Sequence, residues 1–243
     1  SGALADLRPV AMQATGNLAF SQGIPVALEG AETLLEGPLA VAFDWDGRLL
    51  QIPQLTVPGL TVSGQLATIT PSAADLPEIA ALNFDVQLAG YDLRRLNVLS
   101  PIDPLPALQG YLDFAGQLRG TPTQPHVQGA VALRDTALGA FALASDVQGP
   151  VAFAPGQGAR LNLTGDETRI QLETAPDWLP NTLLFENRDV LARASRQGDW
   201  LSGEISNFPL QALGLQPIQE PSLGVLSGLL QSQFVVNLQD LEQ

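Results

Sequence analysis

The stretch from Gly110 to Leu138 constrains the fold of this chain more than any other part of the sequence. Apolar and polar residues alternate in two segments, and a Gly-Thr-Pro-Thr-Gln-Pro corner at residues 120–125 joins them. A period of two places alternate side chains on opposite faces of a sheet. Prolines lack the N–H that a central strand requires, so they belong in the corner. The pattern predicts two strands with one apolar face and no reactive group.

Strand patterns also cover most of the remaining chain. Turn residues separate apolar runs at short intervals, and Asp46-Gly47 is typical of a two-residue hairpin loop. A helical period is present only at residues 92–99 and 209–213. We therefore expect strands at residues 17–20, 39–45, 49–52, 60–70, 84–90, 151–154, 161–164, 169–174, 181–185, 190–195, 200–206 and 234–238.

Composition narrows the classes of function. The 243 residues, 45% of them hydrophobic, suffice for one large β domain or two smaller ones. The net charge is −14, and every basic residue is an arginine. Such a field repels phosphate backbones and anionic headgroups, which excludes nucleic acid as a partner and disfavours electrostatic docking on a membrane. The absence of cysteine excludes disulfides and thiol nucleophiles.

Candidate catalytic and metal-binding signals are weak throughout the sequence. His126 is the only histidine, and we expect it to face solvent in the corner. The segment 44–47 resembles the opening of a calcium loop but lacks the third carboxylate and the closing glutamate, so we interpret it as a hairpin turn. No Gly-x-Ser-x-Gly elbow occurs. We predict a protein that is not an enzyme and has no catalytic residue, no metal site and no cofactor.

An internal repeat is visible at a spacing of about 117 residues (208 − 91). Segment 91–110 contains a short amphipathic turn, a Pro-Ile pair, a leucine and a glycine ahead of a strand, and segment 208–228 repeats this order. Units that end in such a turn and continue into a run of strands favour an open architecture, in which each unit buries its face against its neighbours.

The motif in residues 110–138 resembles the C-terminal repeats of the TamB family, the translocation and assembly module subunit, within the AsmA-like superfamily. Its elements are an alternating strand, Gly-Thr-Pro-x-x-Pro-x-Val-x-Gly, and a second alternating strand that ends Leu-Arg-Asp-x-x-Leu. A weaker version extends over residues 82–238. The acidic, lysine-free composition is more similar to a cyanobacterial or chloroplast-envelope member of the family.

The resemblance implies an all-β fold, an elongated and mostly antiparallel sheet rolled into an open half-pipe (β-taco) with an apolar inner groove and one or two short helical turns. It implies that residues 1–243 are a fragment of a larger repetitive β structure. Residues 1–80 are a less clearly matched repeat, 81–200 a TamB-like repeat, and 201–243 the truncated start of the next. The whole protein is expected in the periplasm, anchored in the inner or plasma membrane by a segment outside this fragment.

The resemblance also implies a function, which is to carry phospholipids between the two membranes with an Omp85-class (TamA-like) outer-membrane partner. Phospholipid acyl chains are the expected ligand. The residues expected to line the lipid-binding groove are Phe84, Val86, Leu88, Leu112, Phe114, Leu118, Val127, Val131, Leu133, Leu161, Leu163, Ile170 and Leu172.

Other interpretations of the same strands remain open from the sequence. The apolar residues fit a closed core as well as an open lining, although an aromatic content of 6% is low for a sandwich core of this size. A scaffold for outer-membrane protein assembly and secretion would use exposed strand edges instead of the apolar face. An adhesin-like or carbohydrate-binding β-sandwich would need exposed aromatic side chains arranged for stacking.

Overall fold

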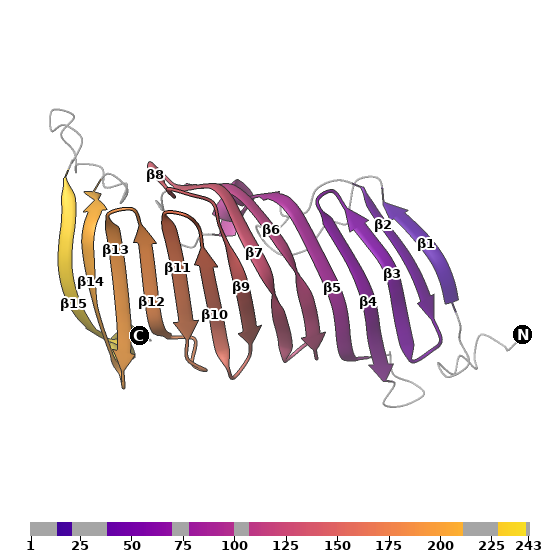
Figure 1. Cartoon of the computed structure of the whole chain (residues 1–243). Coiled ribbons are helices and arrows are strands. Elements are labelled where there is room, and N and C mark those ends of the chain that lie inside the picture. Colours follow the sequence, from indigo (N-terminus) through magenta and orange to yellow (C-terminus); the bar gives the residue numbers. More distant parts are fainter. Residues whose placement is uncertain (1–13, 21–37, 70–77, 100–106, 211–227, 242–243) are drawn as a thin grey trace, which may run out of the picture. The chain divides into compact units, whose positions relative to one another are not determined.

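The computed structural model describes residues 14–20, 38–69, 78–99, 107–210 and 228–241 (Figure 1). Its fifteen strands belong to one sheet, in which β1 to β7 and then β9 to β15 are hydrogen-bonded in sequence order and β8 pairs only with β7. The strands are β1 Ala14–Phe20, β2 Leu39–Trp45, β3 Leu49–Val57, β4 Leu60–Ile69, β5 Glu78–Asp92, β6 Leu108–Gly120, β7 Pro125–Leu138, β8 Phe141–Ala142, β9 Val147–Ala154, β10 Gly158–Thr164, β11 Thr168–Thr174, β12 Pro180–Asn187, β13 Val190–Gln197, β14 Trp200–Pro209 and β15 Leu229–Asn237.

The predicted all-β fold is confirmed, and the antiparallel sheet is open, since β1 and β15 end the strand order without pairing with each other. The predicted helical turn at 92–99 is the 3₁₀ helix η3, Leu93–Leu99, and a second short 3₁₀ helix, η5, spans Leu238–Leu241. The turn expected at 209–213 lies mostly outside the described residues.

Contacts divide the chain into two compact units. Unit 1 comprises Ser1–Ala89 and Phe114–Gly129, and unit 2 comprises Gly90–Asp113 and Ala130–Gln243. Strands β5, β6 and β7 contribute residues to both units. The division into repeats at residues 80 and 200 remains a prediction.

The strand register sorts side chains by polarity within each unit, because residues directly opposite each other share a face. In unit 1, Leu60 lies opposite Leu88 and Val62 opposite Val86, whereas Ser63 lies opposite Asp85 on the other side. In unit 2, Leu161 lies opposite Leu172, and Asn162 lies opposite Gln171 on the other side. We call the side with the leucines the apolar face of each unit and the opposite side its polar face.

Few apolar side chains are fully buried in the part of the chain that the structure describes. They are Val57, Leu93, Val147, Ala154, Leu163 and Leu238. A core residue in a closed domain contacts many neighbours and loses nearly all its exposure. Most side chains on the apolar faces are instead only partly buried, as expected for a single layer with one face incompletely covered.

Phenylalanine rings on the apolar faces lie over glycines of neighbouring strands. A Cβ atom added to Gly203 would lie 2.6 Å from Cζ of Phe234, its cross-strand partner, and one added to Gly64 would lie 2.8 Å from Cδ1 of Phe84. The Phe114 ring of β6 covers Gly129 of β7 in the same way, with Cε2 2.8 Å from the position of an added Cβ atom. Such aromatic–glycine pairs cover exposed backbone and help to fix the register. Each ring lies flat on the sheet, in the space that a side chain would fill if the residue that it covers were not a glycine.

Arginines tie neighbouring strands together on the polar face. Arg160 lies 2.9 Å from Glu173, and Arg193 lies 2.9 Å from Glu204, in each case across one strand pair. Asp113 on β6 accepts hydrogen bonds from the Gly90 amide on β5 and from the Arg134 guanidinium on β7. These bonds from Gly90 and Arg134 lower the pKa of Asp113. One carboxylate thus joins three adjacent strands.

We expect this carboxylate to make stability depend on pH. Because the folded-state pKa lies below the unfolded value of about 4, the contribution is complete above that value and is lost as the pH falls through the folded pKa. Asp113→Asn should therefore lower the free energy of unfolding at pH 7, by less than about 1 kcal/mol for a partly exposed pair. Urea unfolding of both proteins should show the difference shrinking at pH 3. A difference that stays constant between pH 7 and pH 3 would contradict the assignment.

Candidate functional site

One row of apolar residues crosses seven strands of unit 2. Each member lies directly opposite the next, and we call the set the open row. Neighbouring strands lie about 4.8 Å apart, so the row is about 30 Å long. Its members are Val151, Leu161, Leu172, Leu183, Ala194, Gly203 and Phe234.

The middle of the open row is exposed to solvent. Leu183 is 37% exposed although β12 has a strand on each side. Ala194 and Gly203 follow it in the row. Because their side chains are small, the apolar surface forms a shallow depression beside Leu183. A single exposed leucine is ordinary on a protein surface. At Leu183, in the centre of the apolar face, the exposure shows that no other described segment covers the sheet completely there.

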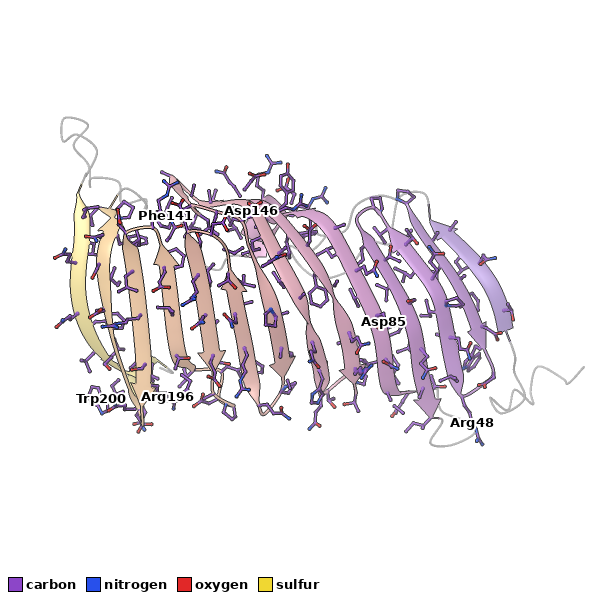
Figure 2. The ribbon with its side chains drawn as sticks, in the orientation of Figure 1. Arg48, Asp85, Phe141, Asp146, Arg196 and Trp200 are labelled. Carbon is purple, nitrogen blue, oxygen red and sulfur yellow. The ribbon has the colours of Figure 1, made fainter. Side chains whose placement is uncertain are left out.

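A short arm, residues 139–146, covers the apolar face on one side of the open row. It contains β8, and its Phe141 ring lies 5.9 Å from the Phe185 ring and 5.2 Å from the Phe208 ring, centre to centre. Asn187 fixes the arm, since its side chain accepts a hydrogen bond from the Ala144 amide at 2.6 Å and donates one to the Ala142 carbonyl at 3.1 Å. Figure 2 shows Phe141 at one end of the strands and Arg196 at the other.

The arm covers part of the neighbouring row, which we call the arm-side row: Leu163, Ile170, Phe185, Ala192, Ile205 and Ser232. Leu163 is only 1% exposed, so its prediction as a groove-lining residue needs correction. It lies on the predicted face, opposite Ile170, but as a buried core residue. The sequence pattern gives the face of Leu163 but not what covers that face.

A loop at residues 175–179 borders the other side of the open row. Trp178 stacks on Phe153, with ring centres 4.9 Å apart and planes at 25°. Asp177 lies 2.8 Å from the Arg196 guanidinium, whose hydrogen bonds lower the pKa of Asp177. Arg196 lies opposite Leu201 at the margin of the apolar face. We call residues 175–179 the rim loop.

The structure brings four of the predicted residues together. Leu161 and Leu172 lie side by side in the open row, and Leu163 and Ile170 lie side by side in the arm-side row. On unit 1, Phe84, Val86 and Leu88 lie opposite Gly64, Val62 and Leu60 on the apolar face.

The remaining predicted residues lie on β6 and β7. All are partly buried and alternate with residues such as Asp113, Gln117 and Arg134, whose side chains bond across the polar face. Phe114, Leu118 and Val127 belong to unit 1, and Leu112, Val131 and Leu133 belong to unit 2.

Sequence reasoning missed the half of the open row that holds the exposed surface. Leu183 lies in a continuous apolar run with Leu184 and Phe185, which shows no alternation from which to assign faces. Ala194 and Gly203 are too small to stand out as ligand contacts. The signal that identifies them is the pairing of Leu172 with Leu183, which only the register provides.

Among the described residues, no group of three or more His, Cys, Asp or Glu side chains is placed to hold a metal ion. His126 is exposed, as predicted, but it lies in β7 and not in the corner. Within the same residues, no helix has the length and apolar content to cross a bilayer. Comparison with protein-family models, curated proteins and solved structures gave no match.

The two neighbouring rows should respond differently to a buried charge. Leu163→Asp places a carboxylate where the side chain is 1% exposed, and we expect a loss of about 3 kcal/mol or more in unfolding free energy. Leu183→Asp places it at a position open to water, and we expect a loss of about 1 kcal/mol or less. Urea denaturation measures both. Equal losses would mean that the open row is covered as completely as Leu163.

Proposed function

We propose that the open row binds lipid acyl chains and that the protein carries phospholipid along its apolar face. The observation that carries this proposal is the exposed Leu183 in the middle of an uninterrupted apolar row. Each methylene moved from water onto such a surface gains up to about 0.8 kcal/mol. A hydrocarbon chain laid along the row would therefore stabilise a surface that the sheet alone leaves in water.

The chemistry of the row favours flexible aliphatic chains over rigid or polar ligands. Its seven members carry no charge and no side-chain hydrogen-bonding group. The one aromatic ring, that of Phe234, lies over Gly203. The length of about 30 Å equals the hydrocarbon thickness of a bilayer, which is two acyl chains end to end. A surface without directional contacts holds a chain and also lets it slide.

The resemblance to the TamB family supports the wider proposal. In it, the protein is a periplasmic bridge, anchored in the inner membrane, that supports outer-membrane biogenesis with an Omp85-class partner. The open sheet is compatible with this role, because strands added at either end would extend the apolar face without a change of architecture.

A second candidate function is a scaffold for outer-membrane protein assembly through strand edges. The observation in its favour is on β15, the last strand of the sheet, where Leu229 is 64% exposed and Val235 is 66% exposed. An extended peptide added to such an edge would gain main-chain hydrogen bonds and apolar contacts. We do not propose the carbohydrate-binding sandwich, since the described strands form one sheet and not two packed sheets.

Native mass spectrometry with added palmitoyl-oleoyl phosphatidylcholine, whose headgroup has no net charge, tests the lipid proposal. Leu183→Asp should reduce lipid occupancy at least fivefold, because the chain would have to desolvate the new carboxylate. Leu184→Asp is the matched control, since Leu184 lies opposite Arg193 on the polar face and its variant should keep the wild-type occupancy.

Equal lipid occupancy in both variants would contradict binding at the open row. An absence of lipid on the wild type, combined with binding of an extended apolar peptide that Val235→Pro abolishes, would favour the strand-edge scaffold instead.

A further inference from the structure

The open row lies between two covered margins of the same face. Side chains that share a face recur every second residue, so successive rows are about 7 Å apart along the strands. On one margin the arm places Phe141 against Phe185 of the arm-side row. On the other margin, Trp178 of the rim loop covers Phe153, the next residue of β9 on the same face as Val151. These rings bound the open row on its two sides, Phe141 at β12 and β14 and Trp178 at β9.

The arm is fixed to the sheet by buried polar groups. Asn187 is 5% exposed and Thr168 is 2% exposed. The Asn187 carbonyl oxygen accepts hydrogen bonds from the Ala144 amide and, at 2.8 Å, from the Thr168 hydroxyl. Breaking these bonds in a buried place would leave polar groups unsatisfied. The arm therefore acts as a fixed wall and not as a flap.

The strand that leads into the arm is also held in place. Asp135 has a φ of 50°, in the left-handed region that few residues other than glycine adopt. The Asp146 carboxylate, at the far end of the arm, accepts a hydrogen bond from the Asp135 amide at 3.0 Å. The far end of the arm is thus joined to the strand that leads into it, which sets the path of the arm over the arm-side row.

We propose that the arm, through Phe141, sets the width of the ligand strip so that unit 2 accepts one hydrocarbon chain across its breadth. This inference rests on the proposed function. A single-chain amphiphile places its whole tail on the open row, whereas a two-chain lipid leaves its second chain in water or displaces the arm. The arm is then a specificity-determining element, which favours single chains and passes two-chain lipids one chain at a time.

The test compares stearoyl lysophosphatidylcholine with dioleoyl phosphatidylcholine, each as a competitor of a fluorescent fatty acid. The wild type should bind stearoyl lysophosphatidylcholine at least about tenfold more tightly than dioleoyl phosphatidylcholine. Phe141→Ala removes the ring that covers Phe185 and Phe208, so this ratio should fall at least fivefold. Phe141→Leu keeps an apolar side chain and should give an intermediate ratio. Trp200→Ala, which removes a 53% exposed aromatic ring on the polar face, is the control and should leave the ratio unchanged.

Thermal unfolding identifies which variants are folded, and Phe141→Leu carries the test if Phe141→Ala does not fold. The proposal is overturned if the wild type binds the single-chain and the two-chain lipid equally. It is also overturned if the affinity ratio in the folded Phe141 variants equals that of the wild type. Failure of the proposed function itself is a different result, in which neither probe binds to the wild type.

Discussion

A single-layer sheet has two faces, and in this protein only one of them is polar. In this chain, alternation along the strands and antiparallel pairing between them place leucine opposite leucine over many strands. A second sheet would normally bury such a face. The described strands all belong to one sheet, and fully buried apolar side chains are few among them. The incomplete burial of this apolar face is therefore the constraint on which the arrangement of the other segments depends.

The described residues of unit 2 respond by covering the margins of that face and leaving its middle uncovered. The arm and the rim loop bring Phe141 and Trp178 onto rings of the sheet itself, and Asn187 and the Asp177–Arg196 pair hold these segments in place. On the polar face, ion pairs between neighbouring strands hold the layer together without adding to the apolar surface. The result is an apolar surface left open between two fixed margins, which is the surface that we propose binds acyl chains.

Where apolar and polar residues alternate, the sequence was sufficient to predict the strand and its two faces, because alternation is a local property. Leu161 and Leu172 were placed correctly for this reason, and Leu39–Trp45 has the predicted bounds. The arm was not predicted, since residues 139–146 have no period and are fixed by Asn187, 43 residues away from Ala144. The exposed part of the open row depends on the register between β11 and β12, which the continuous apolar run at 183–185 leaves ambiguous.

A cysteine scan along β12 tests most directly whether the apolar face is open and binds acyl chains. The chain has no cysteine, so single substitutions at residues 182–185 can each carry an environment-sensitive fluorophore. Addition of a long-chain fatty acid should shift the emission to the blue at Leu183, less at Phe185, which contacts the arm, and not at Thr182 or Leu184 on the polar face. Shifts of equal size at all four positions, or no shift at Leu183, would contradict an open apolar face that holds the chain.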